Sequence, residues 1–263
     1  MTVSLYVPGN RPDRFDKALA AGADEIIIDL EDSVPEAAKA AARADAASWL
    51  RSHSDAPAWV RVNNRPDLIA PDLEMAAPLA PLGVVMPKAD HESCDLVGVQ
   101  LLALVESARG VLDLPDLAAN AGIRRLALGE ADLCADLGIE PSPDNRELWA
   151  IRSQMVTVSA ANGLDAPTGP VFTDLNDLDR LRESSEELRR QGFGGRSAIH
   201  PSQLEVIADV FAPTAAESVW ARAVISAYED AGADSGGVAV VDGEFVDAAV
   251  VRRARRLLAK ESR

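Results

Sequence analysis

Short apolar runs of four to six residues alternate along the chain with longer amphipathic stretches. Runs of this length indicate β-strands, and the stretches between them have the periodicity of helices. The pattern therefore predicts βα units and a parallel sheet. The eight expected strands are Ser4–Val7, Glu25–Asp29, Ala58–Val62, Gly83–Met86, Leu101–Val105, Arg125–Leu128, Asp165–Thr168 and Arg196–Ile199.

A helix is expected after each strand, and eight such pairs favour an α/β fold of the (β/α)8 TIM-barrel type over residues 1–212. The alternative is an open doubly wound sheet, but no GxGxxG fingerprint follows the first strand. Pro167 and Pro170 fit only a strand end or an irregular segment. The expected helices are Arg11–Ala21, Pro35–Arg51, Asp67–Ala80, Asp95–Val99, Gly110–Ala121, Asn145–Asn162, Leu175–Gln191 and Pro201–Phe211.

Residues 213–263 have a different pattern and are expected to form a C-terminal extension. An extension that follows a completed barrel usually acts as an active-site lid or an oligomerisation arm. Asp242-Gly243 predicts a tight hairpin between two short strands. The expected order is a helix at Thr214–Ala231, a linker at Gly232–Gly237, strands at Val238–Val241 and Glu244–Val246, and a helix at Ala248–Lys260.

Composition narrows the classes of function. The net charge of −16 argues against nucleic acid and anionic membranes as partners, because both require a basic face. No apolar run is long enough to span a bilayer. Cys94 and Cys134 are isolated and fit reduced thiols, and the N-terminus has no features of a signal peptide, so a cytoplasmic protein is expected.

The candidate chemistry begins with two carboxylates. Glu106 follows the apolar run Leu101–Val105, and Asp132 comes shortly after Leu126–Leu128. If both runs are barrel strands, the two carboxylates emerge on the same rim, where together they are able to hold a Mg²⁺ ion with open positions for substrate. The alternative is that both are rim charges in water.

Arg61 interrupts an apolar run, and strand alternation places its side chain in the barrel interior. An unpaired charge there is costly, so Arg61 needs carboxylate partners or an anionic ligand. The sequence leaves two roles open for Arg61, a structural salt bridge and a contact with substrate.

Asp29, Glu31 and Asp32 place three negative charges within four positions at the end of the second strand. Such crowding requires cations nearby. Lys39 and Arg43 on the following helix are the expected partners, and support of a metal through water is the other possibility.

Two further candidates are assigned modest roles. Lys88 follows Pro87 beyond its strand, so we expect a charge partner rather than a Schiff-base nucleophile. His200 precedes Pro201 at a helix start, where a structural hydrogen bond is expected.

Seven motifs occur in an order that resembles one known family. They are Leu5-Tyr6-Val7-Pro8-Gly9-Asn10, Asp29-Leu30-Glu31-Asp32, Val60-Arg61-Val62-Asn63, Pro87-Lys88, Val105-Glu106-Ser107-Ala108-Arg109-Gly110, Gly129-Glu130-Ala131-Asp132-Leu133 and Ala198-Ile199-His200-Pro201-Ser202-Gln203. Across essentially the whole chain, the sequence resembles the citrate lyase beta-subunit-like family of the HpcH/HpaI aldolase superfamily. That family includes malyl-CoA and citramalyl-CoA lyases.

The resemblance implies a Mg²⁺-bearing TIM barrel that forms a trimer or a multiple of it, with a CoA thioester and a 2-keto acid as its ligands. In the family, the residues matching Glu106 and Asp132 hold the metal, and the residue matching Arg61 binds the keto-acid carboxylate. The other positions that the resemblance places at the substrate are Tyr6, Lys17, Gly129, Glu130, Ser197 and Ala198.

The resemblance also implies that Asp247, from the tail of a neighbouring subunit, acts as acid/base; its position equally suits a helix N-cap before Ala248. Two departures stand out. Thr2-Val3 replaces an Arg-Ser pair before the first motif, and Gly169 lies near the aspartate expected at the end of the seventh strand.

These assignments imply cleavage of a 3-hydroxyacyl-CoA between C2 and C3. Arg11, Arg14 and Lys17 are expected to attract the CoA phosphates. Three alternatives remain: a citrate lyase beta subunit acting on a carrier-protein thioester, a metal-dependent hydroxy-acid aldolase without CoA, and a non-catalytic relative. The second usually has a histidine base after an early strand, and no histidine precedes His53 here.

Overall fold

The computed structural model of the protein describes residues 1–95, 98–231 and 238–259. The chain divides into two compact units, Thr2–Ala208 and, together with Met1, Asp209–Arg263. We describe each unit by itself. The expected role of the C-terminal extension as a lid or an oligomerisation arm stays a prediction.

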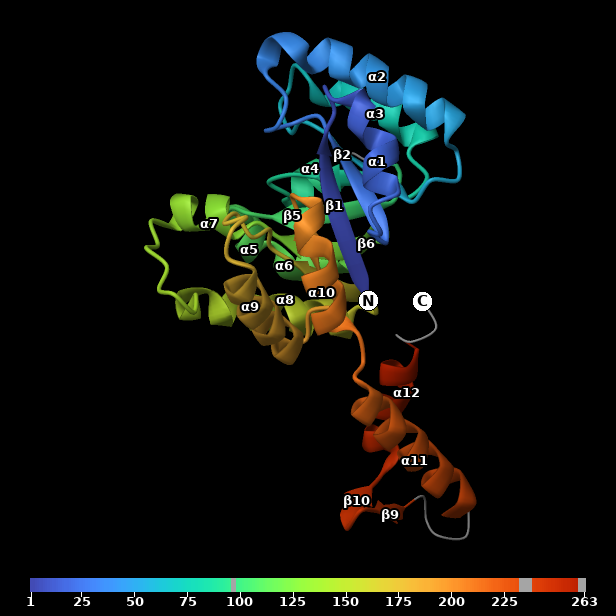
Figure 1. The fold of residues 1–263 in the computed structure, drawn as a ribbon. Coiled ribbons are helices and arrows are strands. Elements are labelled where there is room, and N and C mark those ends of the chain that lie inside the picture. The colour runs from blue at the N-terminus through green and yellow to red at the C-terminus, as the bar shows by residue number, and fades with distance from the viewer. Residues whose placement is uncertain (96–97, 232–237, 260–263) are drawn as a thin grey trace. The chain divides into compact units, whose positions relative to one another are not determined.

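The first unit is a closed barrel of eight parallel strands in sequential order (Figure 1). Closure is made by β1 and β8, which pair from Thr2↔Gly195 to Leu5↔Ala198. The predicted (β/α)8 fold is confirmed, and the open sheet is excluded by this pairing. The strands are β1 (Thr2–Pro8), β2 (Glu25–Asp29), β3 (Ala58–Arg61), β4 (Gly83–Met86), β5 (Leu101–Val105), β6 (Ile123–Leu128), β7 (Asp165–Gly169) and β8 (Gly195–Ala198).

Three strands, β2, β4 and β5, have the predicted bounds and are buried at every position. Parallel strands covered on both faces read as continuous apolar runs, which is why these were the clearest signals in the sequence. In β7, which contains Pro167, the pairing with β6 shifts register between Arg125 and Ala127. The expected irregularity of the seventh strand is therefore present.

Helices and short 3-10 turns connect the strands, and several expected single helices are divided. Proline accounts for one division, since Pro115 begins a second helix after α5. The elements are η1 (Pro12–Arg14), α1 (Phe15–Leu19), η2 (Glu36–Ala38), α2 (Lys39–Ser52), α3 (Ile69–Leu79), α4 (His91–Asp95), α5 (Ala108–Leu112), α6 (Leu114–Ala119), α7 (Glu130–Leu137), η3 (Arg146–Leu148), α8 (Trp149–Ala161), α9 (Leu178–Gln191), η4 (Pro201–Gln203) and α10 (Leu204–Phe211).

Two expectations about helices were wrong. No helix was expected between the sixth strand and Asn145, but α7 begins directly after Gly129 and ends before Gly138, which adopts a left-handed φ of 66°. Helix α4 lies at His91–Asp95 instead of Asp95–Val99. Part of the expected helix, residues 96–97, lies outside the described residues.

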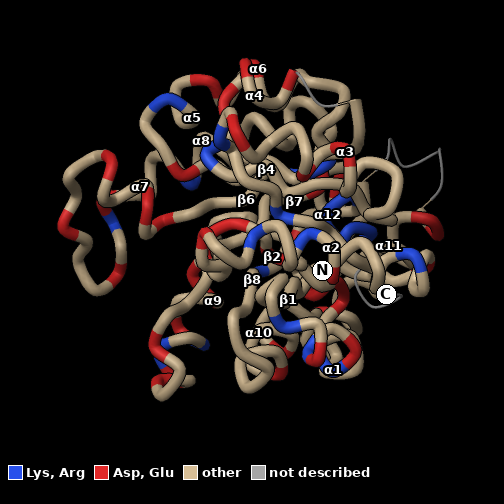
Figure 2. The backbone as a smooth tube through the Cα atoms, turned by 90° about the horizontal axis from the view of Figure 1, so that it is seen from above, with Lys and Arg blue, Asp and Glu red and all other residues tan. Residues whose placement is uncertain are grey.

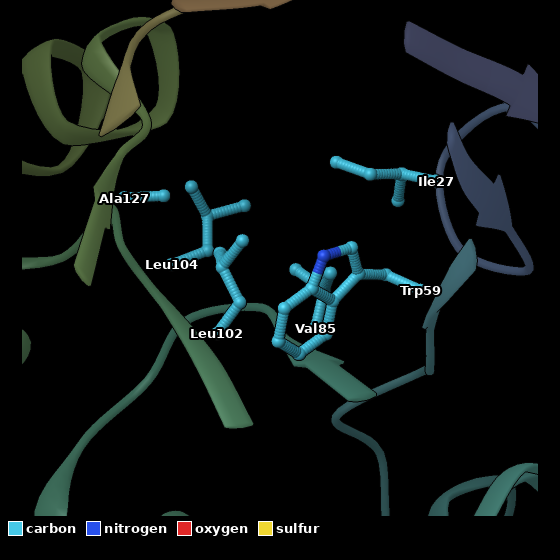
Figure 3. Close-up of a cluster of buried hydrophobic side chains, with 6 residues drawn as sticks. All are labelled: Ile27, Trp59, Val85, Leu102, Leu104 and Ala127. Carbon is cyan, nitrogen blue, oxygen red and sulfur yellow. The ribbon is translucent and has the colours of Figure 1, made fainter. Parts of the chain in front are cut away.

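The barrel interior is filled by side chains from five strands, and Figure 3 shows the Trp59 ring extending from β3 toward Leu102 of β5. One large indole fills the space that several smaller side chains would otherwise occupy in a protein with only 4% aromatic residues. The cluster comprises Ile27, Trp59, Val85, Leu102, Leu104 and Ala127.

The second unit contains α11 (Ala215–Ala231), β9 (Ala239–Val241), β10 (Glu244–Val246) and α12 (Ala248–Leu258). The predicted hairpin is confirmed. Asp242 and Gly243 at its turn have φ values of 50° and 83°, as a type I′ turn requires. The expected linker Gly232–Gly237 lies outside the described residues.

The helices were also tested for membrane spans. Within residues 1–95, 98–231 and 238–259, none combines the length and the apolar character needed to cross a bilayer.

Candidate active site

A cavity of about 870 Å³ lies at the C-terminal ends of the barrel strands. Its wall brings together seven of the ten residues predicted to bind metal or substrate or to act in catalysis: Tyr6, Arg61, Glu106, Gly129, Glu130, Asp132 and Ser197. Residues from strands far apart in sequence converge here because all the strands are parallel and end on one rim. The other residues singled out in the sequence are described below.

Glu106 follows β5 immediately and is only 4% exposed. Its Oε1 accepts a hydrogen bond of 2.8 Å from the backbone N–H of Lys88. Burial, aided by the charges of Glu31 and Asp132, raises the pKa of Glu106 to about 7 against this opposing hydrogen bond. A cation at the carboxylate would reverse this effect, so the position is electrostatically suited to one.

Asp132 lies in the first turn of α7, where a negative charge is favoured by the helix dipole. In the described part of the chain its carboxylate forms no hydrogen bond and no ion pair. It is exposed to the cavity and close enough to Glu106 to raise that residue's pKa. Figure 2 shows further acidic residues along α7, which add to the negative field at this edge of the barrel.

The two carboxylates fit a hard divalent cation. Mg²⁺ binds oxygen ligands and commonly takes one or two protein carboxylates, with water and substrate in the remaining positions. Across the described residues, no cluster of three or more His, Cys, Asp or Glu is able to hold a metal. Glu106 and Asp132 would therefore leave most coordination positions to water and ligand.

Arg61, at the end of β3, is the centre of a buried ion-pair network. Its Nε and Nη2 donate to the two carboxylate oxygens of Asp29 at 2.7 and 2.8 Å. Its Nη1 lies 3.0 Å from Glu31 Oε2 and 3.6 Å from Asp32 Oδ2. The expected structural salt bridge is present, and Arg61 also lines the cavity beside Tyr6, whose ring centroid is 5.0 Å from its Cζ.

The expected partners of the acidic strand end were wrong. Lys39 Nζ donates instead to the backbone carbonyls of Leu30 and Glu31 and to Asn63 Oδ1, at 2.7–3.0 Å. Arg43 pairs with Asp72 at 2.6 Å. The reason is strand pairing: Asp29 and Arg61 are partners in the register of β2 and β3, so the cation comes across the sheet and not from the next helix.

Lys88 has the charge-partner role expected of it. Its Nζ lies 3.3 Å from Glu31 Oε1, and its backbone adopts a positive φ of 46° that directs its N–H toward Glu106. His200 caps the following turn, where its Nδ1 accepts a hydrogen bond from the N–H of Ser202.

Four residues given roles in ligand binding take different positions. Ala198 is fully buried and does not line the cavity. Lys17 of α1 and Arg14 of η1 are exposed, outside the cavity wall. Arg11 is paired with Asp13 in two hydrogen bonds of 2.9 Å, so its charge is already matched. Contact of Ala198 with the substrate stays a prediction. Contact of Arg11, Arg14 and Lys17 with phosphates also stays a prediction.

Glu130 begins α7 and points its carboxylate at a buried arginine. Its Oε1 lies 2.6 Å from Arg152 Nη2, and its Oε2 accepts a hydrogen bond from Asn145. This leaves Glu130 less available to a metal than Asp132.

Asp247, in the second unit, caps helix α12. Its Oδ1 accepts hydrogen bonds from the N–H groups of Ala249 and Val250, at 2.8 and 3.0 Å. These bonds hold the pKa of Asp247 below its usual range. The expected N-cap is confirmed, and an additional acid/base role stays a prediction.

Sequence reasoning missed the arginines of the cavity wall. Arg152 of α8, Arg180 of α9 and Arg196 of β8 all line the cavity. The signal was available for Arg196, because a charged residue within a barrel strand raises the same question as Arg61 does.

Comparisons with known proteins identify the family of the chain. The sequence profile of the HpcH/HpaI aldolase/citrate lyase family matches residues 2–94 and 95–201. The chain therefore belongs to the HpcH/HpaI aldolase/citrate lyase family, as its sequence motifs predicted.

Proteins similar to this chain include a malyl-CoA thioesterase and a citrate lyase subunit. A (3S)-malyl-CoA thioesterase of Cereibacter sphaeroides is 34% identical over 97% of this chain and 93% of its own length. The citrate lyase subunit beta of Leuconostoc mesenteroides subsp. cremoris is 33% identical over 97% of this chain and 91% of its own.

Among solved structures, CitE of Mycobacterium tuberculosis in complex with magnesium, acetoacetate and coenzyme A is similar, with a TM-score of 0.85 and 31% identity over 100% of this chain and 98% of that one. A citrate lyase beta subunit from M. tuberculosis with oxaloacetate and magnesium has a TM-score of 0.72 and 33% identity over 81% of this chain and 97% of its own.

Proposed function

We propose that the protein is a Mg²⁺-dependent carbon–carbon lyase. It would cleave or form a 3-hydroxyacyl-CoA, such as malyl-CoA or citramalyl-CoA, with a 2-keto acid and acetyl-CoA as the products of cleavage. The observation that carries the proposal is the pair Glu106 and Asp132, two carboxylates open to a cavity that also contains Arg61. Similarity to a structure that holds magnesium, acetoacetate and coenzyme A supports it.

Glu106 and Asp132 would hold the ion. When bound, Mg²⁺ supplies Lewis acidity to the hydroxyl and carboxylate oxygens of the substrate. The backbone N–H of Lys88 fixes Glu106 through Oε1. This hydrogen bond fixes the orientation of the carboxylate, so the other oxygen, Oε2, would be presented to the metal in a defined geometry.

Arg61 would bind and orient the carboxylate of the keto acid. Asp29 holds Nε and Nη2, and Glu31 lies 3.0 Å from Nη1, so the position that Asp32 takes at Nη1 is the one open to a ligand. Asp32, the more distant partner of Nη1, has a side chain 62% exposed and is free to turn toward water. A substrate carboxylate would replace it and keep the charge of Arg61 matched.

Asp247, from the tail of a second copy of the chain, would act at the thioester side. Its lowered pKa keeps Asp247 ionised near neutral pH. In the condensation direction it would therefore act first as a base and remove a proton from the acetyl-CoA carbon that becomes the enolate.

A second candidate is thioester hydrolysis, favoured by the similarity to a (3S)-malyl-CoA thioesterase over nearly the full length of both chains. Hydrolysis adds water across the C–S bond and leaves the carbon skeleton intact. A citryl thioester on a carrier protein is a further alternative, because a citrate lyase subunit beta is about as similar.

The test separates these reactions by their products. Malyl-CoA and citramalyl-CoA are incubated with the protein in Mg²⁺ or in EDTA, and the products are separated by liquid chromatography and mass spectrometry. A lyase releases acetyl-CoA with glyoxylate or pyruvate, whereas a thioesterase releases free CoA with malate or citramalate. Mg²⁺-dependent acetyl-CoA supports the proposal. Turnover equal in EDTA, or no turnover of either ester, would overturn it.

A further inference from the structure

One wall of the cavity is made by arginines that the proposed reaction does not use. We call it the arginine wall. It consists of Arg152, Arg180, Ser184 and Arg196, from α8, α9 and β8. Helices α8 and α9 pack against each other and lie side by side in Figure 1.

Arg196 is a buried cation whose protein partners are all neutral. It is 3% exposed. Its Nε donates to the Pro170 carbonyl at 2.8 Å, and its Nη1 donates to the hydroxyls of Ser184 and Ser185 at 2.7 and 3.0 Å. The remaining nitrogen, Nη2, donates to no atom in the part of the chain that the structure describes, although the residue lines the cavity.

The charge of Arg196 is not balanced by an ion pair. In residues 1–95, 98–231 and 238–259 no carboxylate lies within ion-pair distance of it, and burial lowers its pKa to about 10. Glu130, whose charge acts to raise the pKa of Arg196, is already paired with Arg152 at 2.6 Å. A guanidinium taken out of water without a counter-charge is unfavourable, so the site is incomplete as built.

The neighbouring strand has no acid at the position paired with Arg196. Gly169 is the partner of Arg196 in the register of β7 and β8, and an added Cβ there would lie 2.7 Å from Leu188 Cδ1 and 3.7 Å from Arg196 Cγ. The wall thus contains a buried cation whose cross-strand partner has no side chain to balance its charge.

Arg180 adds a second positive charge to this wall. It is four residues before Ser184 on α9, so the two side chains share one face of the helix. Among the described residues its one ion pair is a surface contact of 3.1 Å with Glu183, which is easily exchanged for another partner.

We propose that the arginine wall is a subsite for an oxyanion, either a carboxylate or a phosphate group, bound by Nη2 of Arg196 with Arg180 as the second cation. The subsite is separate from the metal-binding pair and does not depend on which bond the enzyme breaks. A ligand that occupied both the metal site and this subsite would carry two acidic groups, one at each end.

The experiment measures anion binding directly, without Mg²⁺ and without turnover. Sodium phosphate and disodium succinate are titrated into the full-length protein by calorimetry in EDTA, and the Nε–Hε resonance of Arg196 is followed by NMR. The variants are Arg196→Met and Arg180→Gln. The matched control is Arg51→Gln, which removes one exposed charge from α2, away from the cavity wall.

We expect saturable binding of at least one probe. The probe that binds more tightly identifies the subsite as one for a phosphate or for a carboxylate. Affinity falls roughly 10-fold or more in Arg196→Met, since a charged hydrogen bond is lost, and a few-fold in Arg180→Gln, and it is unchanged in Arg51→Gln. If Arg196→Met does not fold, the wild-type resonance and Arg180→Gln decide the question.

Equal affinity in the wild type and in Arg180→Gln, together with an Arg196 resonance that does not move, would overturn the subsite; so would the absence of saturable binding of both probes. Asp132→Asn separates this proposal from the proposed reaction, because it should bind the anion as the wild type does while turnover is lost.

Discussion

Gly129 and Glu106 pack so closely that no larger residue fits at position 129. A Cβ added to Gly129 would lie 2.5 Å from Glu106 Oε2 and 2.7 Å from Glu106 Cβ. The glycine therefore sets the position of the carboxylate, and its own φ of −106° shows that the requirement is one of space and not of backbone conformation.

Gly129→Ala should displace Glu106 and reduce catalysis. We expect kcat/KM to fall by about 100-fold, because misplacing a reactive group by about 1 Å has an effect of that size. The matched control is Gly98→Ala, where an added Cβ meets nothing within 4 Å. Steady-state kinetics of both variants test this, and a Gly129→Ala enzyme as active as Gly98→Ala would contradict the positioning role.

Removal of either carboxylate of the metal-binding pair should abolish metal-dependent turnover while the fold persists. Asp132→Asn is the cleaner variant, since Asp132 is exposed and has no partner among the described residues. We expect weaker Mg²⁺ binding by calorimetry, a loss of at least about 100-fold in turnover, and an unchanged Tm. Glu106→Gln should behave in the same way. Normal activity in either variant would refute the metal assignment.

The ion pair between Asp29 and Arg61 should make stability depend on acidic pH. Burial acts to raise the pKa of Asp29, but the hydrogen bonds and charge of Arg61 outweigh it, and the net pKa is lowered. The stabilisation is complete above the unfolded value of about 4 and is lost as pH falls through the lower folded value.

Asp29→Asn measures this contribution. Breaking one side of a buried pair should reduce the free energy of unfolding at pH 7 by about 3 kcal/mol. The difference between wild type and variant should narrow as pH falls below about 4, because Asp29 is then protonated in the unfolded wild type but still ionised in the folded one, and it should level off below the lower folded value. Urea unfolding at several pH values tests it, and a difference that stays constant with pH would rule out the ion pair as its source.

The fold was largely predictable from the sequence because barrel strands are buried on both faces. β2, β4 and β5 appear as apolar runs with clear ends. Helix α7 was not predicted because it is only eight residues long and begins directly after Gly129. Leu133, Cys134 and the terminal Gly138 nevertheless carry an ordinary helical pattern.

The site was predictable only as far as single strand ends determine it. Glu106 and Asp132 follow from their apolar runs, since parallel strands share a rim. The partner of Asp29 did not follow, because sequence separation favours Lys39 whereas strand register supplies Arg61. Arg196 was overlooked because its neutral partners come from α9 and the loop after β7, which the sequence does not place beside it.

The two roles of Asp247 are separable by substitution. Serine accepts a hydrogen bond from a helix N-terminus, whereas alanine does not, so Asp247→Ser should keep the cap of α12 and Asp247→Ala should lose it. We expect thermal unfolding of the serine variant to resemble the wild type and that of the alanine variant to begin earlier. Neither side chain exchanges a proton as a carboxylate does, so both variants should lose turnover if Asp247 is the acid/base. Full activity in Asp247→Ser, with reduced stability only in Asp247→Ala, would leave the residue a helix cap alone.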